Sequence, residues 1–327
     1  MAKAFLFSEF GSVDVLNVQE LDVPLPGKGE IRLRQRAIGV NYIDIYHRRG
    51  VFAPKLPLPS GIGVEGVGVV VAVGEGVAGF YPGDRVAYVG GPPGAYATER
   101  NVPAARALKV PDGLSDDVVA ATIFKGLTAE YLTHRCIDVQ VGDNVLFHAA
   151  AGGVGSIACQ WLKAKGARVI GTVGSEAKAR LALSNGCDDV ILYRKQDFAA
   201  RVRELTDGTG VRVVYDSVGA DTFAGSLKSL RPRGLLVSFG ETSGPVPPVE
   251  IAQLGSLGSL YLTRPSIAHY TSDRKEFEAA GARLFSALLD GTIRPGEITG
   301  FALEDAALAQ AAVENRKTVG SVVLKCS

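Results

Sequence analysis

One segment, residues 144–161, limits the fold of this chain more than any other. It reads NVLFHAAAGGVGSIACQW, an apolar run followed by small residues and then by residues that favour a helix. Ala150, Gly152 and Gly155 have the spacing of a G-x-G-x-x-G loop, whose backbone N–H groups bind a pyrophosphate at a helix N-terminus. Alanine replaces only the first glycine, which tolerates replacement best. The segment therefore predicts a strand, a phosphate-binding loop and a helix that begins near Val154.

A glycine-rich turn in an ordinary strand–helix–strand unit is the alternative interpretation of this loop. The apolar run RVIGTV at residues 168–173 favours phosphate binding, because a dinucleotide-binding fold needs its second strand there. Strand-like and helix-like segments alternate from about residue 126 onward, which predicts a doubly wound parallel sheet of the Rossmann type. The preceding part contains short apolar runs separated by proline and glycine, which predict a mainly antiparallel β domain. Together these patterns predict an α/β fold.

Composition narrows the possible partners. The chain has 327 residues, of which 46% are hydrophobic, enough for two domains with large cores. Its 35 lysines and arginines balance 34 acidic residues, so no net field attracts nucleic acid or an anionic membrane. The N-terminal run is too short and too interrupted for a signal peptide, no run approaches a membrane span, and the four cysteines show no CxxC spacing. We predict a cytoplasmic protein without nucleic-acid or membrane partners.

The residues after the second predicted strand bear on the choice of cofactor. NAD-binding proteins usually place an Asp or Glu there, about 20 residues after the glycines, against the adenosine ribose. Residues 172–175 carry no charge here, and Glu176 is expected in the first turn of the next helix, facing water. We predict NADP, with its 2′-phosphate held by Ser175, Lys178 and Tyr193. For Lys178 alone, a solvated helix face is an equally good interpretation.

Seven motifs spread over most of the chain carry a resemblance to a known superfamily. They read AIGVNYIDIYHRRG, LPSGIGVEGVGVVVAVGEGV, GDRVAY, FKGLTAEYL, HAAAGGVGSIACQW, VVYDSVG and LVSFGETSG. In order and spacing the sequence resembles the medium-chain dehydrogenases/reductases, and among them the zinc-free quinone oxidoreductases related to zeta-crystallin. The resemblance implies a GroES-like catalytic domain of residues 1–125 and 266–327, and a Rossmann NADP-binding domain of residues 126–265.

The sequence departs from the zinc-dependent members of that superfamily. Asn41 and Val64 stand where those relatives have a cysteine and a histidine ligand. Zinc needs several nitrogen or sulfur ligands that converge on one point, and the remaining candidates are dispersed, so we predict no metal. Glu65 keeps a position that resembles the acid beside the zinc site, and both a structural and a functional role remain open. His148 is expected to pack at a strand end.

The resemblance also implies residues for the reaction and for the cofactor. The residues predicted to take part in the reaction are Asn41, Asp44, Tyr46 and Arg264. The residues predicted to bind NADPH are Asn41, Thr128, Ala150, Gly152, Gly153, Val154, Gly155, Gly174, Ser175, Lys178, Tyr193, Ser217, Phe239, Gly240, Glu241 and Arg264. The alternatives for the first set are that Asn41 and Asp44 cap a turn and that Tyr46 belongs to the core.

The lack of zinc ligands favours an acceptor that needs no Lewis acid. Hydride transfer to a quinone gives a stabilised hydroquinone anion, whereas an ordinary ketone gives an alkoxide that a metal or a positioned donor must stabilise. The implied function is NADPH-dependent reduction of a small-molecule quinone. The alternatives are reduction of the activated carbon–carbon double bond of an enone, and an RNA-binding or structural role associated with some zeta-crystallin relatives. The near-zero net charge disfavours RNA.

Residues 255–266 bear on assembly. They read GSLGSLYLTRPS and predict a late apolar strand at the edge of the sheet. An unpaired apolar edge is satisfied when it pairs with its copy across a two-fold axis, and the resemblance also suggests this. We predict a homodimer.

Overall fold

The two regions of different sequence texture form two compact units in the computed structural model. The structure describes residues 1–51, 55–315 and 317–326. The first unit contains Met1–Lys125, Gly281–Leu289 and Pro295–Ser327, and the second contains Gly126–Ala280 and Asp290–Arg294. Residues 266–280 and 290–294, predicted with the catalytic domain, therefore group with the second unit. Among the described residues, no helix has both the length and the apolar character that crossing a membrane requires.

Two sheets form most of the first unit. The smaller sheet has the order β2-β1-β4 and contains β1 (Ala2–Phe7), β2 (Asn17–Leu21) and β4 (Ser60–Gly61). The larger sheet has the order β15-β16-β3-β5-β6-β8, with β7 also paired to β3, and contains β3 (Glu30–Val40), β5 (Glu65–Val73), β6 (Arg85–Val89), β7 (Glu99–Pro103), β8 (Ala107–Lys109), β15 (Ile298–Ala302) and β16 (Ser321–Lys325). Antiparallel pairing dominates, as predicted, and only β15 and β16 pair in parallel among the described strands of this unit.

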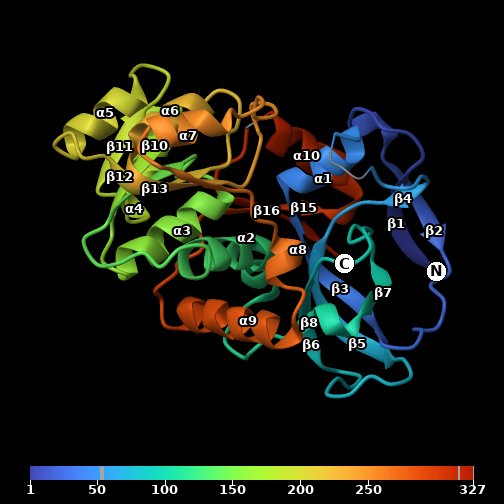
Figure 1. Ribbon diagram of the computed structural model, residues 1–327. Helices are drawn as coiled ribbons and strands as arrows, with labels where there is room; N and C mark the ends of the chain where they lie inside the picture. The colour runs from blue at the N-terminus through green and yellow to red at the C-terminus, as the bar shows by residue number, and fades with distance from the viewer. Residues whose placement is uncertain (52–54, 316, 327) are drawn as a thin grey trace. The chain divides into compact units, whose positions relative to one another are not determined.

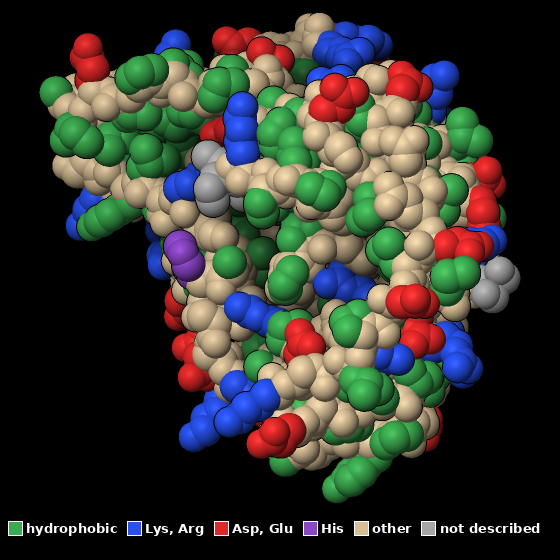
Figure 2. Space-filling model, turned by 90° about the vertical axis from the view of Figure 1, so that its right-hand side faces the viewer, with side chains coloured by type: hydrophobic (Ala, Val, Ile, Leu, Met, Phe, Trp, Pro, Cys, Tyr) green, Lys and Arg blue, Asp and Glu red, His purple; other side chains and the backbone are tan. Residues whose placement is uncertain are grey.

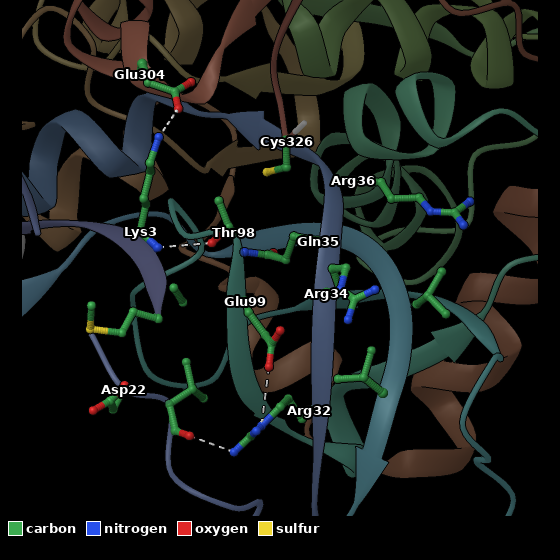
Figure 3. A pocket seen from close by; sticks show the side chains of 15 residues that line it. Lys3, Asp22, Arg32, Arg34, Gln35, Arg36, Thr98, Glu99, Glu304 and Cys326 are labelled. Atoms are coloured by element: carbon green, nitrogen blue, oxygen red, sulfur yellow. Dashed lines mark hydrogen bonds and ion pairs between the residues drawn. The ribbon is translucent and has the colours of Figure 1, made fainter. Parts of the chain in front are cut away.

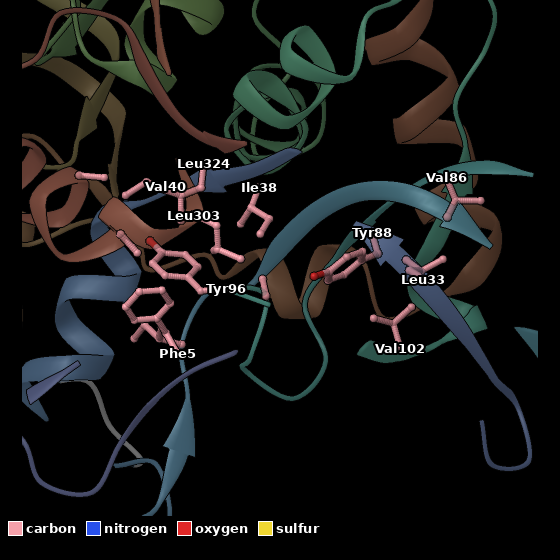
Figure 4. Close-up of a cluster of buried hydrophobic side chains, with 14 of the residues drawn as sticks. Phe5, Leu33, Ile38, Val40, Val86, Tyr88, Tyr96, Val102, Leu303 and Leu324 are labelled. Carbon is pink, nitrogen blue, oxygen red and sulfur yellow. The ribbon is translucent and has the colours of Figure 1, made fainter. Parts of the chain in front are cut away.

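Alternation along the strands builds the core of the first unit. Ile31 and Leu33 of β3 are fully buried, whereas Arg34, between the buried Leu33 and Gln35, is exposed. Figure 4 shows Leu33 beside Tyr88 in one part of this core, and Tyr96 with Leu324, from near the end of the chain, in another. The C-terminal strand β16 lies beside β3, with Val322 opposite Val40. The end of the sequence thus completes the core of the N-terminal sheet.

A buried arginine connects two short helices of the first unit. Helix α1 (Tyr42–Arg49), which was not predicted, contacts α10 (Ala306–Glu314). The fully buried Arg48 donates to Gln310 at 2.8 Å and pairs with Glu314 at 2.6 Å. Short 3-10 helices occupy Val13–Val15, Ala104–Arg106 and Leu303–Asp305.

The second unit is built on a six-stranded parallel sheet of order β11-β10-β9-β12-β13-β14. Its strands are β9 (Asn144–His148), β10 (Arg168–Val173), β11 (Asp189–Leu192), β12 (Val211–Asp216), β13 (Leu230–Ser238) and β14 (Tyr261–Thr263). The helices are α2 (Asp116–His134), which begins in the first unit, α3 (Gly153–Ala164), α4 (Glu176–Ser184), α5 (Phe198–Leu205), α6 (Phe223–Ser229), α7 (Ile251–Ser256), α8 (Ile267–Tyr270) and α9 (Arg274–Leu289), which ends in the first unit. In Figure 1, α3 lies on one face of this sheet and α5 and α6 on the other. The predicted α/β fold with a doubly wound parallel sheet is confirmed.

The predicted edge strand at residues 255–266 is wrong in extent. Helix α7 takes its first two residues, and β14 is only Tyr261–Thr263. Gly258 and Ser259 adopt positive φ angles of 116° and 56°, a conformation that strands exclude. The strand does lie at the edge of the sheet, beside β13.

Candidate active-site and cofactor-binding residues

The predicted strand, glycine loop and helix are all present in the second unit. Strand β9 ends at His148, Gly152 is the N-cap residue of α3, and the helix begins at Gly153, one residue earlier than predicted. A Cβ atom on Gly155 would lie 2.5 Å from the Ala149 carbonyl oxygen, and one on Gly152 would lie 3.1 Å from it. Only glycine fits at Gly155, because its helical turn lies directly against the loop backbone. The loop therefore brings the unpaired N–H groups of α3 close to the end of β9, as phosphate binding requires.

The structure explains why alanine can replace the first glycine. Ala150 is fully buried, and its backbone N–H donates to the Thr172 carbonyl oxygen on β10 at 3.2 Å. The space for its methyl group comes from Gly171, where a Cβ atom would lie 2.8 Å from that of Ala150 and 2.8 Å from the sulfur of Cys187. The missing glycine of the loop is thus compensated by a glycine on the neighbouring strand.

The residues predicted to hold the 2′-phosphate gather where β10 ends. The Ser175 hydroxyl is the N-cap of α4 and accepts from the Lys178 N–H at 3.4 Å. The Tyr193 hydroxyl lies 3.4 Å from the position a Cβ atom would take on Gly174, and the Arg194 Nε lies 3.5 Å from that position. Sequence analysis missed Arg194, although a second cation next to a predicted phosphate ligand was a usable signal. The hydroxyl groups of Ser175 and Tyr193 and the Arg194 guanidinium therefore lie near this strand end.

Glu176 does not disturb this group. It lies in the first turn of α4, as predicted, and is 64% exposed with an ion pair to Lys195 at 3.1 Å. A carboxylate that binds the adenosine ribose would have to face the strand end instead. This arrangement supports the prediction that the site takes a phosphorylated ribose.

A second predicted group lies at the carboxyl ends of β12, β13 and β14. The Arg264 guanidinium donates to the Ser238 hydroxyl at 3.3 Å and to the Gly240 carbonyl oxygen at 3.4 Å, and it pairs with Glu241 at 3.1 Å. Gly240 packs on Ser217 so closely that a Cβ atom would lie 2.7 Å from its carbonyl oxygen. Ligands of open α/β sheets bind at strand carboxyl ends, so these residues are in the expected place.

Aromatic and polar side chains pack against one another near these strand ends. The ring of Phe239 lies 5.9 Å from that of Phe147 on β9. His148 is fully buried at its strand end, as predicted, between the hydroxyls of Thr172 at 2.8 Å and Ser226 at 3.0 Å. Burial lowers the pKa of His148, which favours the neutral ring between these two hydroxyls.

In the first unit, Asn41 and Asp44 form a buried polar cluster with Glu65. The Asn41 N–H donates to Asp44 Oδ2 at 2.9 Å, while the Asn41 side-chain Nδ2 donates to Glu65 Oε1 at 2.5 Å. Glu65 Oε2 accepts from the Phe124 N–H at 2.7 Å. The Lys125 ammonium lies 3.9 Å from Glu65 Oε1. The capping alternative for Asn41 and Asp44 therefore holds for α1, and the same side chains also meet a buried carboxylate.

Burial sets the protonation of this cluster. It raises the pKa of Asp44 to about 7, against the opposing hydrogen bonds from the Asn41 N–H and the Tyr96 hydroxyl. Burial also raises the pKa of Glu65 and lowers that of Lys125, which their mutual attraction opposes. One buried cation faces two buried carboxyl groups, and a pKa of about 7 leaves a large fraction of the Asp44 carboxyl protonated near neutral pH. Sequence analysis missed Lys125, a lysine within the otherwise apolar stretch TIFKGL.

The two remaining predicted residues lie in different units. Tyr46 of α1 packs edge-on against Tyr42, with ring centroids 5.0 Å apart, and is half-buried. Thr128 lies on α2 and is 6% exposed. Tyr46 thus belongs to an aromatic pair at a half-buried position of α1.

Asn41 and Val64, which stand where zinc-dependent relatives have metal ligands, do not form a metal site. Val64 is buried and apolar, and the Asn41 amide is engaged with Glu65. Within the described ranges, no three His, Cys, Asp or Glu side chains lie close enough to hold a metal ion. All four cysteines are free thiols.

A polar depression of about 740 Å³ lies on the first unit, and none of the predicted site residues lines it. It is lined by side chains of β3, β5 and β7 and by the ends of the chain (Figure 3). Lys3, Arg32 and Arg36 on its walls pair with Glu304, Glu99 and Asp116. Basic and acidic side chains are also mixed over the face shown in Figure 2. Cations that are already paired on a mixed surface do not favour a polyanionic partner.

Comparison with known proteins covers the whole chain. Its residues 27–112 match the alcohol dehydrogenase GroES-like domain, and residues 153–286 match the zinc-binding dehydrogenase family. A quinone oxidoreductase of Pseudomonas aeruginosa is 46% identical over 324 residues, 99% of each chain. A 2-haloacrylate reductase of a Burkholderia species is 44% identical over 329 residues, again 99% of each.

A solved structure agrees with these sequence matches. The crystal structure of Escherichia coli quinone oxidoreductase complexed with NADPH has a TM-score of 0.95 to this chain at 43% identity, and the match covers 99% of both chains. Likeness at this level over the full length goes beyond a shared fold. The chain belongs to the quinone oxidoreductase family of the medium-chain dehydrogenase/reductase superfamily.

Proposed function

We propose that this protein is an NADPH-dependent quinone reductase that works without zinc. The observation that carries the proposal is the phosphate-binding loop, in which Gly155 leaves no room for a side chain beside the Ala149 carbonyl. The donor groups at residues 152–155 fit a pyrophosphate, and Ser175, Lys178 and Tyr193 fit a 2′-phosphate. When bound, NADPH supplies the hydride. Relatives of known name, among them the NADPH-complexed structure from Escherichia coli, support this assignment.

The protein's own residues position the reactants. Asn41, whose amide is held by Glu65, orients the nicotinamide ring, and Tyr46 lines the quinone cavity. A quinone needs no metal to stabilise its reduced anion, and the proton can come from water. Asn41 and Val64 cannot replace the cysteine and histidine of a zinc site, which supports zinc-free chemistry.

Steady-state assays with a quinone and with an enone test this function. We expect NADPH-dependent quinone reduction with a higher kcat/KM than enone reduction, and full activity after exhaustive chelation. The second candidate is an enone reductase, favoured by the 44% identity to a 2-haloacrylate reductase. A higher kcat/KM for the enone would establish that candidate, and loss of turnover on chelation would show that a metal is required.

Cofactor preference gives a sharper test at the 2′-phosphate group. Lys178→Ala should lower kcat/KM for NADPH by one to two orders of magnitude and leave that for NADH unchanged, because a charge-assisted hydrogen bond to phosphate contributes about 1.5–3 kcal/mol. The exposed Lys228→Ala on α6 serves as a matched control. Equal use of NADPH and NADH by the wild-type protein would contradict this prediction.

We further propose that the protein is a cytoplasmic homodimer joined through β14. Tyr261 on this edge strand is 61% exposed and Leu262 is 37% exposed, so two copies could pair into one continuous sheet. Light scattering at micromolar concentration should report a dimer. Tyr261→Lys should weaken it, since like charges would meet near the two-fold axis, whereas Tyr81→Lys, at a similarly exposed tyrosine outside β14, should not. A wild-type monomer would refute the proposal.

A further inference from the structure

Both oxygens of the buried Glu65 carboxylate are committed to donors from different elements. Oε1 accepts from the Asn41 side chain at 2.5 Å, and Oε2 accepts from the Phe124 backbone N–H on α2 at 2.7 Å. The Phe124 donor is part of a helix and cannot turn. Gly39 on the neighbouring strand leaves room for the carboxylate, since a Cβ atom there would lie 2.0 Å from Oε1. The carboxylate is therefore fixed in position.

A fixed acceptor determines which way an amide faces. An amide carries two donors on nitrogen and an acceptor on oxygen, and only the nitrogen can face an ionised carboxylate. The Asn41 oxygen is consequently turned away from Glu65. Asn41 is also the N-cap residue of α1, where an acceptor suits the unpaired N–H groups of the helix. Both neighbours thus select the same orientation of the amide.

Lys125 opposes the effect of burial on Glu65 and favours the ionised form of its carboxyl group. Its ammonium lies 3.9 Å from Glu65 Oε1 and donates to the Val40 carbonyl oxygen at 3.5 Å, in a site where it is 8% exposed. A buried carboxylate without such a cation would take up a proton, and a protonated oxygen could act as a donor. The lysine therefore favours Glu65 as a hydrogen-bond acceptor.

We propose that Glu65 is a positioning residue for hydride transfer: it fixes the orientation of the Asn41 amide and, through it, the nicotinamide ring. The inference rests on the proposed role of Asn41 at the nicotinamide. Glu65 itself exchanges no proton with the substrate. Its effect reaches the reaction only through the direction in which Asn41 presents its oxygen and its nitrogen.

Glu65→Gln reverses the hydrogen bond. The glutamine oxygen must face the Phe124 N–H, so its NH2 group faces Asn41, and two donors cannot face each other. Asn41 then flips and turns its nitrogen toward α1 and the cofactor. We expect kcat to fall about 10- to 100-fold, as small misplacements of reactants do, while the KM for NADPH stays near the wild-type value.

A second substitution should restore the geometry. In Glu65→Gln/Asn41→Asp, the glutamine NH2 donates to one carboxylate oxygen of the aspartate, and the other oxygen faces away as the amide oxygen does in the wild type. One buried carboxylate also remains for Lys125. We expect the double variant to recover at least part of kcat and of the thermal unfolding midpoint, whereas Asn41→Asp alone places two carboxylates in contact and is the least stable of the three variants.

The outcomes separate this inference from the proposed function. If Glu65→Gln keeps the wild-type kcat while Asn41→Ala loses it, or if the double variant regains stability without regaining kcat, Glu65 does not position Asn41 for the reaction. If the wild-type protein reduces no quinone with NADPH, the proposed function fails, and the coupling between the two substitutions in the unfolding midpoint still decides whether Glu65 orients the amide. Should Glu65→Gln not fold, Glu65→Gln/Lys125→Met removes both charges, and we expect the same loss of kcat.

Discussion

We expect replacement of Asn41 by alanine to lower kcat for quinone reduction on the order of 100-fold, because the nicotinamide ring that Asn41 is proposed to hold would leave the near-attack geometry. The KM for NADPH should change little, since the residues predicted to bind its phosphates lie in the second unit. Stopped-flow measurement of NADPH oxidation separates the two parameters. Loss of the N-cap also lowers stability by about 1 kcal/mol, so the assay is run well below the unfolding midpoint.

Tyr46→Phe is the control for this prediction. The substitution keeps the ring that packs on Tyr42 and removes only the hydroxyl. Its loss in kcat should be below about 100-fold, the smallest effect expected when a general acid is removed. If Tyr46→Phe proves more damaging than Asn41→Ala, the hydroxyl delivers a proton and the mechanism without a protein acid is wrong.

Asp44→Asn should stabilise the protein at pH 8 and leave it almost unchanged at pH 4. The pKa of Asp44 is raised from 3.8 to about 7, so the folded protein holds one more proton than the unfolded chain between these values. Stability is therefore lost as the pH rises through this window. At 1.36 kcal/mol per pKa unit, ionisation at pH 8 costs on the order of 4 kcal/mol, which asparagine avoids.

Urea unfolding of the two proteins at both pH values measures this effect. Asparagine can still accept from the Asn41 N–H and the Tyr96 hydroxyl, and its NH2 group replaces Oδ1, which has no hydrogen-bond partner among the described residues. Asp221→Asn, at an exposed position of the second unit, is the matched control and should shift the midpoint at neither pH. If the unfolding midpoint of Asp44→Asn is not higher than that of the wild-type protein at pH 8, ionisation of Asp44 does not destabilise the folded protein and the prediction is wrong.

The strand, glycine loop and helix of residues 144–164 could be predicted from sequence because their determinants are local. A strand, a fixed spacing of small residues and a helix follow one another within residues 144–164, and the structure begins α3 within one residue of the prediction. The compensation for Ala150 could not be predicted in this way, since Gly171 belongs to another strand. The edge strand β14 was overestimated because the apolar pattern of residues 255–266 does not reveal the positive φ angles of Gly258 and Ser259.

The polar cluster in the first unit could not be predicted from sequence, because its members also come from different elements. Glu65 was noted for its position, but its contact with Asn41 depends on how β3, β5 and α2 pack. The sequence around Lys125 does not distinguish it from other lysines in helices, because its contact with Glu65 is formed only in the folded protein. Helix α1, by contrast, could have been predicted, since Asn41 and Asp44 have the spacing of a capping box and Gly50 follows the last turn.

The place of β16 between β15 and β3 has a consequence for how the protein is made. Residue 322 pairs with residue 40, so the ribosome releases β3 long before the strand that covers its edge. All six strands of the parallel sheet are synthesised in the interval. The second unit can fold as it emerges, whereas the first remains incomplete, with an apolar strand edge open to other nascent chains. The nucleotide-binding unit therefore matures first, and newly made protein is most vulnerable to aggregation just before its last strand is added.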